Sequence, residues 1–322
     1  MLSKQQIPIS AVIHRDETLL LKDGVKLKAR LWFPKQEGTW PALLMRQPYG
    51  REIASTVTYA HPSWWASHGF LVVIQDVRGQ GDSSGDFNGF IQEASDTTHT
   101  HSWVRSLPEC NGILGTYGFS YQGLTQLLAL PETPPPDCLI PAMTGLNEAE
   151  HWSSEGGAFW WHIGLAWGLQ LAAQKVKRLG DKKAWTDIRE SLENKRYLLE
   201  GPLLLQKYDP NGMAMKWLRE SNESNKKPTI HKPLKAWLKQ PMLLIGGWWD
   251  PHVNGILDIY QQSIESGGKP EIHIGPATHL QWWEGAQMLQ LRFFKQHLQK
   301  LTFSTSNNSK LHYWNLTTNQ WQ

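Results

Sequence analysis

The sequence predicts an α/β protein in which a mostly parallel sheet carries helices on both faces. Short apolar runs such as PALLMR, FLVVIQDV and PMLLIGG are typical of strands that are buried on both faces. Helix-length segments separate these runs, and this alternation indicates βαβ units. A hairpin is predicted at the start of the chain, because alternating apolar and polar residues flank the turn pair Asp23-Gly24.

The remaining elements follow the same alternation. Further strands are expected at GILGTYG, DCLIPAM and EIHIGP, with helices over 93–105, from Ser120 toward Leu130, and in VNGILDIYQQSIES and QWWEGAQMLQLRFFKQHLQKL. Between about 147 and 238 the apolar residues recur at helical spacing instead, which predicts an inserted helical cap. The predicted division is 1–146 and 239–301 for the two parts of the core, 147–238 for the cap, and 302–322 for a tail that resembles a strand with its turn.

Composition narrows the class of protein. The 322 residues are 40% hydrophobic and 19% charged, as in a folded globular chain. A net charge of +3 without long basic runs argues against nucleic acid as a partner. The first residues lack the apolar core of a signal peptide and no stretch is long enough to span a membrane, so we expect a cytoplasmic protein without membrane contact. Cys110 and Cys138 are predicted to be free thiols, and neither a metal nor a cofactor is expected.

The chain contains 18 tryptophans, and several are adjacent in sequence. Two interpretations stay open at this stage. Paired indoles pack well in a core, and because each carries one hydrogen-bond donor they also line ligand pockets. The pairs are Trp64-Trp65, Trp160-Trp161, Trp248-Trp249 and Trp282-Trp283.

The segment LGTYGFSYQG places Ser120 after a buried strand and before a helix. A nucleophilic serine in the α/β-hydrolase fold sits on such a sharp turn, with Gly118 and Gly123 allowing the strand and the helix to approach. Gln122 stands where the usual G-x-S-x-G motif has its second glycine. Taken alone, the serine could equally be a helix N-cap.

Two further residues favour catalysis. Asp250 follows the strand PMLLIGG and His279 follows EIHIG, in the chain order serine, acid, histidine that this fold uses. His252 is a weaker candidate, since it is only two residues from Asp250, and Asp258 and His273 fall within a helix and a strand. We therefore predict a catalytic triad of Ser120, Asp250 and His279.

An oxyanion hole needs at least two hydrogen-bond donors. The Tyr121 amide follows the nucleophile and supplies one. In the loop MRQPYGR, Pro48 has no N–H to donate, so the hydroxyl of Tyr49 is the predicted second donor.

These motifs together resemble the cocaine-esterase and X-Pro dipeptidyl-peptidase-like family of α/β-hydrolases (CocE/NonD hydrolases). The similar segments are RQPYGR, DVRGQGDSSGDF, GFSYQG, GGWWD and GPATH, and the family's elbow also has its glycine one position later. The resemblance implies a serine hydrolase that cleaves acyl esters or amides through an acyl-enzyme, with X-Pro dipeptidyl-peptidase-like activity on short peptides as one form. It implies the same triad and the same oxyanion donors.

The resemblance also has departures. Ala277 and Thr278 stand where the family often has an aromatic residue beside its base, and the tail resembles the beginning of the family's C-terminal jelly roll, most of which is expected to be missing. A chain without that domain is expected to self-associate. The alternative functions are a catalytically inactive interaction protein with this fold and, from the G-x-G in DVRGQGDSSG, a nicotinamide enzyme. In the hydrolase interpretation, Arg78 and Asp82 are instead structural residues that brace the loop near the nucleophile.

Overall fold

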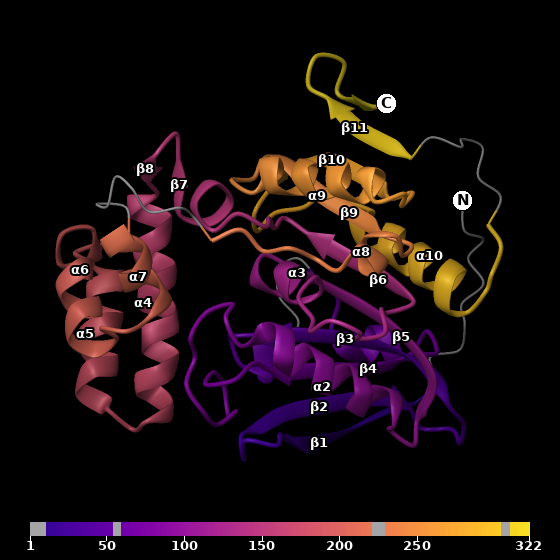
Figure 1. The fold of residues 1–322 in the computed structure, drawn as a ribbon, viewed down its shortest axis with the longest axis horizontal. Helices are drawn as coiled ribbons and strands as arrows, with labels where there is room; N and C mark the ends of the chain where they lie inside the picture. The colour runs from indigo at the N-terminus through magenta and orange to yellow at the C-terminus, as the bar shows by residue number, and fades with distance from the viewer. Residues whose placement is uncertain (1–10, 54–58, 221–228, 304–309) are drawn as a thin grey trace.

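The structure is a computed structural model, and it describes residues 11–53, 59–220, 229–303 and 310–322. In these residues, ten strands form one sheet in the order β1-β2-β4-β3-β5-β6-β9-β10-β11-β12 (Figure 1). The pairs from β4 to β11 are parallel, and the outer pairs β1-β2, β2-β4 and β11-β12 are antiparallel. The bounds are β1 (Val12–Leu20), β2 (Lys26–Pro34), β3 (Trp40–Gln47), β4 (Leu71–Asp76), β5 (Cys110–Phe119), β6 (Cys138–Ala142), β9 (Leu243–Trp249), β10 (Glu271–Thr278), β11 (Leu311–Asn315) and β12 (Gln320–Trp321).

Helices cover both faces of this sheet. Along β4, Val72 and Ile74 pack in the cluster that contains α1 and α10, whereas Leu71 and Val73 pack against α2. Alternate residues of one strand point to opposite faces, so an uninterrupted apolar strand needs a helical layer on each side. The covering helices are α1 (Pro62–Ala66), α2 (Glu93–Arg105), α3 (Tyr121–Thr125), α8 (Lys235–Leu238), α9 (Val253–Glu265) and α10 (Ala286–Leu298). The predicted fold class is confirmed.

Two helices differ in length from their predictions. The helix after Ser120 has only five residues, and the last predicted helix begins at Ala286 rather than in the QWW segment. Gly285 explains the later start, because it has a φ of 92° and breaks the helical path just before α10. A short 3₁₀ turn, η1 (Arg51–Ile53), follows β3.

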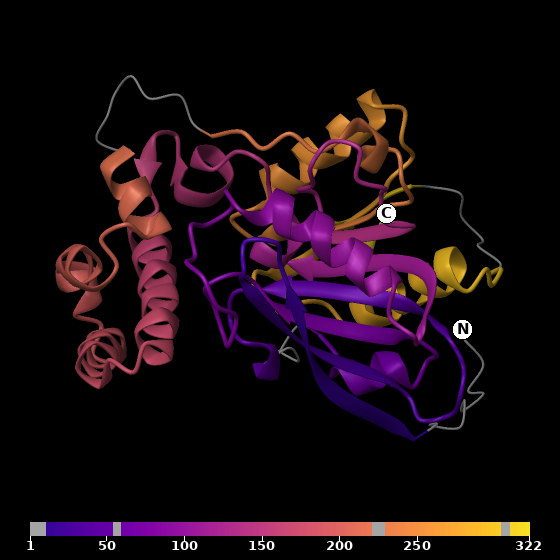
Figure 2. The ribbon, with the colours of Figure 1, turned by 60° about the horizontal axis from the view of Figure 1, so that its bottom comes forward.

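The described part of the predicted cap segment contains five α-helices. Helix α8 packs with α9 against the core of the sheet, and the other four pack mainly on one another. They share a cluster of buried residues that includes Leu165, Leu169 and Tyr197. Figures 1 and 2 show these helices standing beside the sheet rather than over one of its faces. They are α4 (Trp161–Arg178), α5 (Lys182–Glu193), α6 (Tyr197–Tyr208) and α7 (Met213–Glu220). The exact domain bounds at 147 and 238 stay a prediction.

The sequence analysis missed a small hairpin at the entry to these helices. A π-helical turn, η2 (Ala149–Ser153), leads into β7 (Ser154–Glu155), which pairs with β8 (Ala158–Phe159). Two-residue strands carry too few residues for an alternating pattern to be recognised. At the other end, the tail forms β11 and β12, as expected for a strand with its turn. Within the described ranges, no helix is long and apolar enough to cross a membrane.

Candidate active site

Ser120 occupies a strained turn between β5 and α3. Its backbone has φ 59° and ψ −128°, a conformation that residues other than glycine rarely adopt. Its N–H donates to the carbonyls of Ala142 and Met143 at 3.0 and 3.1 Å, which anchors the turn to the end of β6. The strain is therefore held in place by the neighbouring strand, as a nucleophile elbow requires.

The positions of Gly118 and Gly123, on either side of Ser120, leave no room for a Cβ atom. A Cβ on Gly123 would lie 2.8 Å from the Ala142 carbonyl oxygen and 2.7 Å from Cβ of Thr144. A Cβ on Gly118, which has φ 148°, would lie 2.4 Å from Cβ of Gln122. The close approach of strand and helix that the sequence predicted is present.

Gln122 has a role that the motif alone does not reveal. Its Oε1 accepts from the N–H of Phe119 at 3.3 Å, and its Nε2 donates to Oε1 of Gln47 at 3.2 Å. Gln47 in turn donates to the carbonyl of Gly50 at 2.9 Å. The side chain at the usual glycine position therefore ties the elbow to the loop that carries Tyr49.

Asp250 and His279 lie side by side just beyond the ends of β9 and β10. Nδ1 of His279 is 2.7 Å from Oδ1 of Asp250, whose side chain is fully buried, whereas 28% of the His279 side chain is exposed. The His279 ring lies 5.2 Å from the ring of Phe119, the residue before Ser120. With Nδ1 engaged, Nε2 is the other ring nitrogen of His279, the one that the predicted role as base requires.

His252 belongs to this cluster, although the sequence ranked it below His279. The backbone N–H of His252 donates to Oδ2 of Asp250 at 3.2 Å, and the His252 ring lies 4.9 Å from the ring of His279. Burial lowers the pKa of His252 to about 4, so this ring is neutral at physiological pH. The sequence analysis set His252 aside because it is only two residues from Asp250, and the same closeness places it in this cluster. Asp258 lies in α9 and His273 in β10, as expected.

Tyr49 lies in the loop after β3, near Ser120. Its hydroxyl accepts a hydrogen bond from Nε1 of Trp167 at 3.1 Å. Loss of hydration raises the pKa of Tyr49 to about 12, and the nearby Trp167 and Ser120 side chains oppose that rise. The phenol therefore keeps its proton and can donate it to an oxyanion. Trp167 lies in helix α4, and nothing in its sequence neighbourhood indicated this contact.

The Tyr121 side chain is buried against the start of α2. Its hydroxyl lies 2.8 Å from two acceptors, the carbonyl oxygen of Gly89 and Oε1 of Glu93, which compete for its single proton. Burial and the neighbouring Glu93 raise its pKa well above the ordinary value. Glu93 also pairs with Arg46, whose Nη1 lies 2.7 Å from Oε2. A buried ion pair therefore supports the residue whose amide was predicted as an oxyanion donor.

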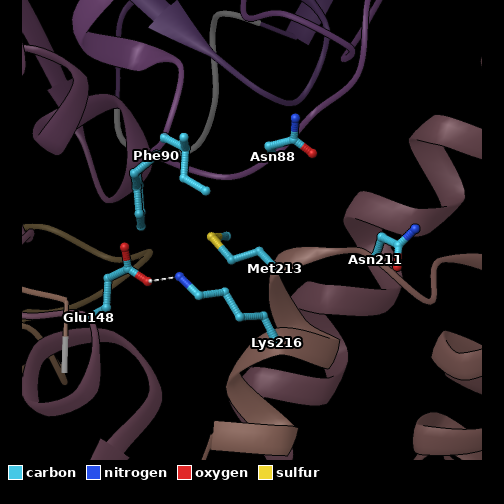
Figure 3. A pocket seen from close by; sticks show the side chains of 7 residues that line it. Asn88, Phe90, Glu148, Asn211, Met213 and Lys216 are labelled. Carbon is cyan, nitrogen blue, oxygen red and sulfur yellow. Dashed lines mark ion pairs between the residues drawn. The ribbon is translucent and has the colours of Figure 1, made fainter. Parts of the chain in front are cut away.

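A cavity of about 140 Å³ lies between the loop before α2 and helix α7, beside this group (Figure 3). Glu148 crosses it to pair with Lys216 at 3.6 Å and accepts from Nε1 of Trp217 at 3.0 Å. Phe90 connects the cavity to the elbow, because its ring stacks on that of Tyr121 at 4.6 Å. Ser120 does not line this cavity. The residues that do are Asn88, Phe90, Ile91, Glu148, Asn211, Met213 and Lys216.

Arg78 and Asp82, in the segment after β4, make the ion pairs expected of residues that brace this loop. Arg78 makes a two-pronged contact with Asp96 at 2.9 and 2.8 Å, and Asp82 lies 2.6 Å from Arg51. A Cβ on Gly81 would meet the Asp76 carboxylate at 2.4 Å. Residues 77–92 form turns, with no helix directly after the G-x-G. This arrangement disfavours a dinucleotide loop.

Core packing accounts for some of the tryptophan pairs and not for others, and the ligand-pocket interpretation stays a prediction. Trp65 is fully buried in the core, and Trp282 and Trp283 pack against the same cluster. Trp248 and Trp249, at the end of β9, are 37% and 58% exposed. Adjacent tryptophans therefore do not share one role.

Among the residues that the structure describes, two groups of side chains have the chemistry to hold a metal ion. In each, three possible ligand atoms lie within 4.8 Å of one another. One group comprises Asp250, His252 and His279, and the other comprises Glu271, His273 and His312. Arg292 lies 3.5 Å from the Glu271 carboxylate, which disfavours a cation there. The expectation of no metal stays a prediction.

The sheet order, the strained serine after β5 and the acid-histidine pair after β9 and β10 define the class of α/β-hydrolase folds. Comparison with known proteins places the chain within this class. Residues 23–281 match the model of the X-Pro dipeptidyl-peptidase (S15) family, and the chain belongs to that family. The recognised resemblance is confirmed.

Individual relatives agree with this placement. The chain is 25% identical over 282 residues to the cocaine esterase of Rhodococcus sp. (strain MB1 Bresler), a match that covers 80% of this chain and 47% of that protein. A CocE/NonD family hydrolase from Staphylococcus aureus superimposes with a TM-score of 0.71 at 17% identity, over 94% of this chain and 56% of the other. An α-amino acid ester hydrolase superimposes with a TM-score of 0.63 at 20% identity, over 98% and 59%. The chain thus spans about half the length of the curated relative that it matches.

Proposed function

We propose that this chain is a serine hydrolase that cleaves acyl esters or amides through an acyl-enzyme intermediate. The observation that carries the proposal is the strained Ser120, with Tyr49 near it, and a histidine that is paired with a buried aspartate. Strain at a residue other than glycine persists only where the surroundings impose it, and such strain concentrates at functional sites.

The proposed reaction has two stages. His279 Nε2 takes the proton from Ser120 Oγ while Oγ forms a bond to the substrate carbonyl carbon, and the C=O electron pair moves onto oxygen. The Tyr49 hydroxyl and the Tyr121 amide donate to that oxyanion. The carbonyl re-forms, the bond to the leaving group breaks, and His279 returns its proton to the leaving alcohol or amine. Water, deprotonated by His279, then releases the acid by the same sequence. Asp250 holds His279 in the tautomer that this requires.

The substrate class is proposed from the relatives. The family is described by X-Pro dipeptidyl peptidases, and the curated relative is an esterase. Both reactions transfer an acyl group to serine and then to water, so the residues proposed above would serve either. Small acyl esters and short peptides with proline in the second position are therefore the proposed substrates. The helical cap over 147–238, the cytoplasmic location and self-association stay predictions.

The test combines labelling with a substrate screen. A fluorophosphonate probe should modify Ser120, because only an activated serine reacts readily with such reagents. p-Nitrophenyl esters of increasing acyl length and X-Pro anilides should separate esterase from peptidase activity. Ser120→Ala is the matched control, and its turnover should fall by several orders of magnitude while its circular dichroism stays unchanged. A wild-type protein that is neither labelled nor active on either series would support the inactive interaction protein instead.

A further inference from the structure

Trp167 brings a hydrogen-bond donor from helix α4 to the hydroxyl of Tyr49. The two residues are 118 positions apart, and Nε1 of the indole lies 3.1 Å from the phenol oxygen. An indole N–H only donates, so the phenol oxygen must accept in this pair. The phenol has a single proton, which is therefore left for a different partner.

The indole of Trp167 is held in a stack of aromatic rings. Its ring lies 6.0 Å from that of Trp152 and 5.6 Å from that of Trp217. The N–H groups of those two neighbours donate elsewhere, to the Gly145 carbonyl at 2.8 Å and to Glu148 at 3.0 Å. Packing on both sides limits the rotation of Trp167, and among these three indoles it is the one that reaches Tyr49.

We propose that Trp167 is a positioning residue that aims the proton of Tyr49 at the oxyanion. This inference rests on the proposed function. Because the indole occupies the acceptor side of the phenol, the phenol proton turns toward Ser120, where the tetrahedral oxygen forms. A hydrogen bond that a hydroxyl accepts also polarises the bond that it donates. Trp167 therefore makes Tyr49 both better oriented and a stronger donor.

The arrangement links α4 to the chemistry at the sheet. Tyr49 and Ser120 follow β3 and β5, whereas Trp167 comes from the helices beside the sheet. Correct orientation of the oxyanion donor thus depends on where α4 sits. A substrate group that displaced α4 would lower the rate of acylation without touching the triad.

The test is a double-mutant cycle on hydrolysis of a p-nitrophenyl ester. Trp167→Phe keeps an aromatic ring and removes the donor, and should lower kcat about tenfold with KM within about threefold, the scale of one hydrogen bond. In a Tyr49→Phe background the same change should lower kcat less than about twofold, because no hydroxyl remains to be aimed. Trp161→Phe is the matched control: it lies in the same helix, donates to the Leu198 carbonyl at 2.8 Å, and should leave kcat unchanged.

A second variant guards against loss of packing. Replacement of Trp167 by 3-benzothienylalanine keeps the bicyclic shape and puts sulfur in place of the N–H, so it should reproduce the fall in kcat at an unchanged melting temperature. Equal losses in the wild-type and Tyr49→Phe backgrounds, or wild-type kcat in the benzothienyl variant, would overturn the inference alone. A wild-type protein that the fluorophosphonate does not label and that hydrolyses no ester would overturn the proposed function and this inference with it.

Discussion

Glu93→Gln should destabilise the protein strongly, because it leaves the Arg46 guanidinium buried without a counter-charge. The two side chains are 0% and 2% exposed, and Nη1 lies 2.7 Å from Oε2. The remaining partners of Arg46 are neutral, namely Gln75 and Thr97 at 2.8 and 2.7 Å. Removing one member of a buried ion pair costs about 3–5 kcal/mol, and because glutamine keeps an acceptor we expect about 3 kcal/mol.

Urea unfolding measures this loss as a lower midpoint at an unchanged slope. Glu200→Gln is the matched control, since it makes the same substitution in the pair with Arg196, whose side chains are 50% and 45% exposed at 3.2 Å. That change should lower the free energy of unfolding by less than about 1 kcal/mol. Equal losses in the two variants would refute the reasoning. They would mean that Glu93, whose pKa burial raises and Arg46 lowers, is already protonated in the folded protein.

Three further predictions concern the triad, acid stability and association. Asp250→Asn should lower kcat about 10⁴-fold with little loss of stability, because His279 would be held in the wrong tautomer, and retention of activity in stopped-flow assays would exclude Asp250 as the acid. Burial holds the pKa of His101 well below its ordinary value, so the unfolded chain binds a proton below about pH 6.5 that the folded chain does not, and stability should fall as pH decreases. His101→Phe can keep the ring stack on Trp237, which lies 5.2 Å away, and should make stability depend less on pH. Urea midpoints at pH 7 and pH 5 measure this dependence. A difference between them as large as in the wild type would contradict the prediction. Trp249, 58% exposed, should promote self-association, so Trp249→Ser should lower the mass measured by light scattering at high concentration, and a wild type that stays monomeric would remove the premise.

Most strands of the sheet could be predicted from the sequence. Strands buried on both faces are continuous apolar runs, and the Asp23-Gly24 turn marks the first hairpin, so these elements depend on local patterns. The helix over Glu93–Arg105 has the predicted bounds. Ser120, Asp250 and His279 were proposed because each follows a predicted strand, and in a parallel sheet the carboxyl ends of strands gather at one edge.

Other features depend on contacts between segments that are remote in sequence. The role of Gln122 required its bond to Gln47, 75 residues earlier, and the contact of Trp167 with Tyr49 spans 118 residues. No periodicity or motif encodes the direction of one hydrogen bond between elements, because that direction follows from how helices pack beside a sheet.

The sequence by itself determined the fold class and the candidate catalytic residues, since strand pattern and chain order are local properties. Only the tertiary structure decided the surroundings of those residues: the positive φ of Ser120, the burial of Asp250 and the buried Arg46–Glu93 pair beneath Tyr121. Strain, desolvation and ion pairing arise from atoms that the chain brings together only when it folds, and these quantities set the chemistry that the candidate residues can perform.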